Sequence, residues 1–235
     1  MNKKTLLIAL ATVVGGAAQA DVVIMDQITG NTFQLGAASQ DFETVNDAFD
    51  IAVADNFTTV VGGNNLTKVT AFLGLYGGTA TVRNFNNITA YRVEIYSSTA
   101  AAGASLTGDA GSMTVAAGSA SRNDLSATAS LVTIPVSIAL MENTNYLISV
   151  IPVMNFGGGF GQSAVWTTNN GTGTPGDKNA IQANPGGGFG FGPTQTIVSS
   201  GLNVDAGYQI EAVPEPGTIA ALGMGALVLL RRRKK

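Results

Sequence analysis

The sequence predicts an all-β body, an antiparallel β-sandwich of jelly-roll type, and three observations favour this fold class. Apolar and polar residues alternate with period two in Lys68–Tyr76 and again in Tyr91–Ile95. Clusters of Gly, Asn, Ser and Thr, such as Gly62–Asn65, separate the alternating segments. No body segment sustains a helical period, so about ten short strands form the predicted sandwich.

Two segments carry the clearest strand signal. Lys68–Tyr76 places Val69 and Leu73 on one side and Thr70 on the other, and Tyr91–Ile95 alternates as a half-buried strand does. Ala100–Ala104 can form a single helical turn. The remaining predicted strands, in chain order, are Asp21–Met25, Phe49–Val53, Phe57–Val61, Ser112–Ala116, Ser130–Val136, Asn145–Ile151, Ala164–Thr167, Thr194–Val198 and Tyr208–Ala212.

Residues 1–20 are predicted to be a secretory signal peptide. Lys3 and Lys4 precede a short apolar run, and the small residues at Ala18 and Ala20 fit a cleavage site before Asp21. A buried N-terminal helix is the alternative, but Gly15 and Gly16 would weaken its end. Signal peptidase is therefore an expected partner, and the predicted body spans residues 21–213.

The C-terminal segment, residues 214–235, combines three parts. Pro214-Glu215-Pro216 precedes the apolar run Ile219–Leu230, which five basic residues close. As a helix this run spans about 18 Å, less than the roughly 30 Å of bilayer hydrocarbon. The basic end stays in the cytoplasm by the positive-inside rule, which places the body outside.

This order of parts resembles the PEP-CTERM sorting signal. The resemblance implies that an exosortase, a membrane-embedded transpeptidase-like protease, recognises Pro214, Glu215 and Pro216 as substrate and removes the tail. It also implies a Gram-negative host that makes exopolysaccharide, and a transient stay in the inner membrane before release to the cell surface or matrix. A short permanent membrane anchor is the alternative.

Composition excludes several chemistries. The chain has no His and no Cys, so it lacks a Ser-His-Asp triad, a thiol nucleophile, the usual zinc ligands and any disulfide. The body holds five of the 12 basic residues and 14 of the 15 acidic ones, a net charge of −9. An acidic body disfavours nucleic acid as a partner because the phosphate backbone would repel it.

The body also resembles a recurrent jelly-roll domain of PEP-CTERM proteins. This likeness implies the fold and no particular activity. The segments that carry it are Ala54–Thr58, Leu66–Phe72, Tyr91–Tyr96, Leu140–Val150, Val165–Trp166 and Tyr208–Ile210.

Two groups of residues are candidate binding sites. Oxygen ligands suit Ca²⁺, and the densest acids are Asp41, Glu43, Asp47, Asp50 and Asp55, although the lack of an Asp-x-Asp-x-Asp-Gly loop favours a solvated acidic segment instead. The word Gly-Gly-Gly-Phe-Gly occurs at residues 157–161 and 186–190. Its rings could stack on sugars, or they could fold back onto the sandwich with the single Trp in the core. The residues of this candidate glycan or partner site are Phe160, Phe189, Phe191 and Trp166.

These observations lead to two function hypotheses. The first is a non-enzymatic exported protein of the cell surface or extracellular matrix, structural or adhesive, that contacts exopolysaccharide and needs no cofactor beyond a candidate Ca²⁺. The second is a secreted polysaccharide-processing enzyme that uses carboxylates, for which Glu94, Glu142 and Glu211 are the isolated candidates.

Overall fold

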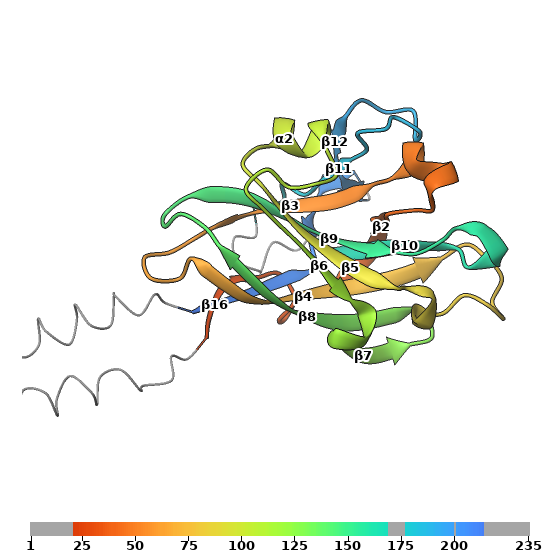
Figure 1. Cartoon of the computed structure of the whole chain (residues 1–235), viewed down its shortest axis with the longest axis horizontal. Helices are drawn as coiled ribbons and strands as arrows, with labels where there is room; N and C mark the ends of the chain where they lie inside the picture. Colours follow the sequence, from red (N-terminus) through yellow and green to blue (C-terminus); the bar gives the residue numbers. More distant parts are fainter. Residues whose placement is uncertain (1–20, 169–176, 200, 214–235) are drawn as a thin grey trace, which may run out of the picture.

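The protein is built mainly from two β-sheets, and its largest hydrophobic core draws on both of them (Figure 1). A computed structural model describes residues 21–168, 177–199 and 201–213. Every pairing between the named strands is antiparallel, which confirms the predicted all-β class. The predicted signal peptide and tail helix lie outside the described residues.

The larger sheet has eight strands and is organised around its longest strand. β4 pairs with β8 along one edge, while β16 and β10 share the other edge. The sheet comprises β1 (Val22–Asp26), β2 (Phe33–Ala38), β4 (Asn65–Tyr76), β7 (Ser121–Ser126), β8 (Ala129–Ala139), β10 (Gln162–Thr168), β15 (Asp205–Ala206) and β16 (Tyr208–Val213).

The smaller sheet has six strands in the order β12-β11-β3-β9-β5-β6. Its members are β3 (Ala52–Thr58), β5 (Ala90–Tyr96), β6 (Gly111–Ala116), β9 (Asn145–Val153), β11 (Ile181–Ala183) and β12 (Thr194–Thr196). A separate hairpin joins β13 (Val198–Ser199) to β14 (Leu202–Asn203). The short helices are η1 (Thr44–Phe49), η2 (Phe85–Asn87), α2 (Thr99–Ala104), η3 (Ala117–Ser119) and η4 (Gly157–Gly159).

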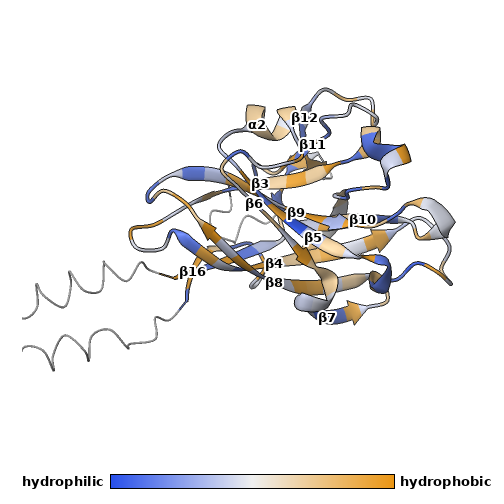
Figure 2. Cartoon of the chain, in the orientation of Figure 1, coloured by the Kyte–Doolittle hydropathy of each residue, from blue (hydrophilic) through white to orange (hydrophobic). Residues whose placement is uncertain are grey.

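The core forms because apolar side chains repeat at every second position. In β8, Val132 and Ile134 are buried, and in β5 the corresponding residues are Val93 and Ile95. All four belong to one cluster that draws on both sheets, as a sandwich requires. Figure 2 shows apolar residues recurring along the strands of both sheets.

The structure corrects the prediction around residue 55. Phe49–Val53 and Phe57–Val61 were expected to be separate strands, but the chain forms one continuous strand, β3, and Phe49 ends η1. By composition alone, the polar pair Asp55-Asn56 indicates a gap between two strands. Backbone N–H groups nevertheless bind the Asp55 carboxylate inside the fold, so the strand continues through it.

The prediction of a single strand at Thr194–Val198 was wrong, because β12 ends at Thr196 and β13 begins at Val198 as part of the separate hairpin. Other strands match the prediction or were missed. The segments predicted at Lys68–Tyr76 and Tyr91–Ile95 are β4 and β5, each slightly longer than expected, and the predicted helical turn is α2. β7 was missed because all of its residues are exposed and carry no apolar alternation. β2 was missed because its sequence is rich in small residues.

The two ends of the described domain lie side by side. Val22 of β1 pairs with Ala212 of β16. Lys68 Nζ contacts both Asp21 Oδ2, at 2.6 Å, and Glu211 Oε2, at 2.9 Å, so one cation ties the first described residue to the last strand. Among the described residues, no helix has the length and apolar character needed to cross a membrane.

Candidate functional site

The acidic segment, which we define as residues 41–50, crosses one end of the sandwich and uses its carboxylates as internal acceptors. Glu43 accepts hydrogen bonds from the backbone N–H groups of Phe156, at 2.7 Å, and Gly157, at 3.2 Å. Asp41 accepts from Arg92 Nη1 at 2.8 Å. Asp47 is exposed on η1. These carboxylates are therefore distributed along the segment, and those of Asp41 and Glu43 bind other parts of the fold.

Asp50 also serves the local structure. Its Oδ1 accepts from the N–H of Phe42 at 2.8 Å. Burial raises the pKa of Asp50 to about 6, and the negative charges of Asp41 and Asp47 act in the same direction. The carboxyl thus favours the protonated state more than an ordinary aspartate does.

Both Gly-Gly-Gly-Phe-Gly loops contact the acidic segment. The first is held by Glu43, and in the second the N–H of Gly188 donates to the carbonyl of Ala48 at 2.8 Å. Cβ atoms on Gly186 and Gly188 would lie 2.7 and 2.5 Å from that carbonyl oxygen. Only glycine permits this close approach, so the repeated word builds two supports for one segment.

The loops and the acidic segment together present a phenylalanine patch, made of Phe42, Phe49, Phe156, Phe189 and Phe191. Phe189 stands edge-on to Phe49, with centroids 5.6 Å apart, and stacks on Phe191 at 6.4 Å. Phe42 meets Phe156 at 6.2 Å, and Phe191 packs against the small cluster that contains Phe42. Phe49, Phe156 and Phe189 keep 42%, 52% and 38% of their surface exposed.

The patch includes two of the four predicted contact residues. Phe160 instead folds back over Gly158 of its own loop, with ring atoms 3.5 Å from the position of a Cβ there. Trp166 lies on the outer face of the larger sheet, stacked on Phe72 at 5.8 Å, because its neighbour Val165 points into the core. No sequence pattern indicated that Phe42, Phe49 and Phe156 belong to a site, because they join the patch only through the folded loops.

A second site lies at the junction of the two sheets. Ligand oxygens of Asp55, Asp177 and Asp205 all lie within 4.8 Å of one another. Asp55 comes from β3 and Asp205 from β15, and both are fully buried, whereas Asp177 is exposed. We call this group the aspartate cluster. Of the five acids predicted as calcium ligands only Asp55 belongs to it, and the other two members were not predicted.

Burial dominates the electrostatics of the aspartate cluster. It raises the pKa of Asp55 well above the usual range, and the charges of Asp205 and Asp177 raise it further. Burial and the charge of Asp177 raise the pKa of Asp205 as well. The group can hold a cation, since its donors are oxygens that converge from three parts of the chain.

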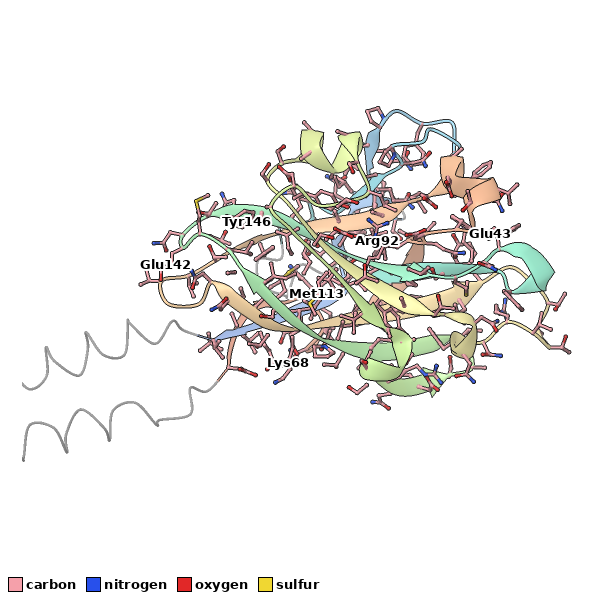
Figure 3. The ribbon with its side chains drawn as sticks, in the orientation of Figure 1. Glu43, Lys68, Arg92, Met113, Glu142 and Tyr146 are labelled. Carbon is pink, nitrogen blue, oxygen red and sulfur yellow. The ribbon has the colours of Figure 1, made fainter. Side chains whose placement is uncertain are left out.

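The carboxylates considered for hydrolysis are each engaged elsewhere. Glu94 is fully buried, and its Oε1 accepts from Arg92 Nε at 2.8 Å (Arg92 is labelled in Figure 3). Glu142 accepts from the N–H of Gly62 at 2.6 Å, and Glu211 pairs with Lys68. Glu94 and Glu211 belong to different sheets.

Strand β16 ends at Val213, so the described domain is followed directly by Pro214-Glu215-Pro216, where the segment that resembles a sorting signal begins. Residues 212–234 match the PEP-CTERM protein-sorting motif, so the chain carries the signal of an exosortase substrate. This confirms the resemblance noted at Pro214-Glu215-Pro216. No match was found among curated proteins.

Proposed function

We propose that this exported, exosortase-sorted protein acts at the cell surface or in the extracellular matrix as an adhesive or structural component that contacts exopolysaccharide. The phenylalanine patch is the observation that carries the proposal. Exposed aromatic rings suit the apolar faces of sugar rings. The glycine-rich loops leave the rings exposed to solvent, and hydrogen bonds with the acidic segment hold the backbone of both loops in place.

The position of the patch supports this role. Strands β1 and β16 bring the ends of the domain to one side, where the sorting tail follows, and Figure 1 shows η1 at the opposite end of the sandwich. Figure 3 places Glu43, which supports the patch, far from Glu142 at the other end. A protein held by its C-terminal side would thus present the patch outward.

The proposed route begins with signal peptidase, which cleaves between Ala20 and Asp21. The apolar run Ile219–Leu230 then holds the chain in the inner membrane until exosortase acts on it. We also propose that the strands of the sandwich follow a jelly-roll order. The host is, in this proposal, a Gram-negative bacterium that makes exopolysaccharide. Asp21 would be the mature N-terminus, and its side chain already pairs with Lys68.

Sorting predicts a defined mature mass. In cells that contain exosortase, we expect the protein to begin at Asp21 and to lack Arg231–Lys235, as read by intact mass spectrometry. Glu215→Ala is expected to abolish tail removal and to leave the protein in the membrane fraction. Asp47→Ala, which removes an exposed acid outside the motif, serves as the matched control. Retention of the basic tail by the unaltered protein would contradict the route.

If the phenylalanine patch binds polysaccharide, removing its aromatic rings should weaken that binding. The Phe49→Ala/Phe189→Ala double variant should bind the exopolysaccharide of the producing cells at least about tenfold more weakly, because two stacking surfaces are lost. Sedimentation with the purified polysaccharide measures the effect. Leu125→Ala/Val198→Ala removes two comparably exposed apolar side chains from other surfaces. Equal binding by the two double variants would count against the patch.

The enzyme hypothesis remains the alternative. A reducing-sugar release assay distinguishes it, since turnover that disappears when one carboxylate is changed would support an enzyme. No observation on the described residues favours a carboxylate pair for hydrolysis, because Glu94, Glu142 and Glu211 each bind a basic side chain or a backbone N–H group. Binding without turnover is therefore the expected result.

A further inference from the structure

The aspartate cluster contrasts with the other buried carboxylate of the fold. Glu94 is fully buried but faces the guanidinium of Arg92. Asp55 and Asp205 are equally buried, and no ion pair of the described residues includes either of them. Backbone N–H groups from Asn56 and Ala206 serve Asp55, at 2.9 and 2.7 Å. The positive charge of Lys178 lowers the pKa of Asp205 but forms no ion pair with it, so no paired cation offsets the cost of burying these two carboxylates.

Two oxygen atoms at the cluster also lack hydrogen-bond partners. Asp205 Oδ1 accepts from the N–H of Lys178 at 2.5 Å, but Asp205 Oδ2 is buried and unpartnered. Asn56 donates through Nδ2 to Asp177 Oδ2 at 2.8 Å, and its own Oδ1 is buried and unpartnered. Buried acceptors are nearly always satisfied, so these two oxygens indicate a ligand that accepts their lone pairs.

We propose that Asp55, Asp177 and Asp205 bind a calcium ion, with Asn56 Oδ1 as a further ligand. Calcium–oxygen distances are about 2.3–2.6 Å, so ligands on opposite sides of one ion lie about 5 Å apart. The three carboxylate oxygens, within 4.8 Å of one another, fit around such an ion. Every donor is oxygen, and the chain has neither His nor Cys, which favours a hard cation.

Calcium would join the two sheets. Asp55 lies on β3 of the smaller sheet and Asp205 on β15 of the larger one. An exported protein without cysteine has no disulfide for this purpose, and a bound cation supplies an equivalent link between distant parts of the chain. The exposed side chain of Asp177 leaves the ion a path from solvent. This inference does not depend on polysaccharide binding.

Thermal unfolding tests the site in the protein purified after export. Metal is removed with EGTA, and CaCl₂ is then added to roughly 10 mM, above the dissociation constants of about 10⁻⁴–10⁻³ M found at extracellular sites. At a hundredfold excess over the dissociation constant, the melting temperature should rise by about 5–10 °C. Isothermal titration calorimetry should show binding heat. An unchanged melting temperature without binding heat overturns the proposal.

Two variants and a control localise the effect. Asp177→Asn changes an exposed residue and should weaken calcium binding at least tenfold without preventing folding. Asp205→Asn should abolish the calcium response, yet melt no lower than the unaltered protein in EGTA, because it removes charge repulsion. Asp47→Asn removes one exposed acidic charge outside the cluster and should respond normally. A normal response from Asp177→Asn and Asp205→Asn, or an equal response to Mg²⁺, would overturn the assignment.

Discussion

Replacing Arg92 with methionine is expected to lower the free energy of unfolding by about 3–5 kcal/mol. The guanidinium donates to Glu94 through Nε and to Asp41 through Nη1, both at 2.8 Å, and to Thr107 through Nη2. Methionine preserves much of the side-chain volume but leaves the Glu94 carboxylate buried without a counter-ion. An unpaired buried charge destabilises far more than a lost surface contact does.

Urea unfolding measures this effect, and two further variants establish its cause. Arg122→Met breaks a pair with Asp124 that is partly exposed on both sides, so it should lose about 1 kcal/mol or less. Adding Glu94→Gln to Arg92→Met removes the buried charge and should recover part of the loss. If Arg92→Met lowers the free energy of unfolding no more than Arg122→Met does, the buried carboxylate of Glu94 does not need Arg92 as its counter-ion.

The same arginine links the core to the candidate binding surface. Asp41 begins the acidic segment, and Phe42 and Phe49 of the patch lie on that segment. Loss of Arg92 should therefore loosen the support of the patch as well as the packing over β5. Weaker polysaccharide binding by Arg92→Met would then be an indirect effect, which the Phe49→Ala/Phe189→Ala variant separates from direct contact.

The alternation in Tyr91–Ile95 predicts the inner face of β5 correctly, but it does not predict what covers the outer face. A half-buried strand over Tyr91–Ile95 places Glu94 on the polar face, opposite Val93 and Ile95. The segment around Gly108 and the acidic segment cover that face, so Glu94 is buried. Such coverage depends on loops whose position follows from the complete fold, and local periodicity does not report it.

The aspartate cluster was predicted only in part for a related reason. Asp55 stands among other acids in the chain, yet its neighbours in space are Asp177 and Asp205, which β11 and β15 bring from far along the sequence. The sorting tail shows the opposite case. Its three parts are contiguous at residues 212–234, so they could be recognised without knowledge of the fold.

Gly108→Ala should be nearly as damaging as the loss of Arg92, at about 3 kcal/mol. A Cβ at Gly108 would lie 2.6 Å from the carbonyl oxygen of Gly111 and from the backbone N of Ile95, and closer still to the Ile95 carbonyl oxygen. These are backbone atoms of paired strands, so they cannot move aside as a side-chain tip can. The loop that contains Gly108 must therefore move away from β5.

Retreat of the loop would also break a hydrogen bond to the buried carboxylate, since the N–H of Gly108 donates to Glu94 Oε2 at 2.8 Å. Gly118→Ala is the matched control because a Cβ there meets nothing within 4 Å, and its stability should be unchanged or slightly raised. Urea unfolding of both variants tests the difference. Equal stabilities would mean that the loop can move without loss, and that Arg92 alone keeps the Glu94 charge inside the fold.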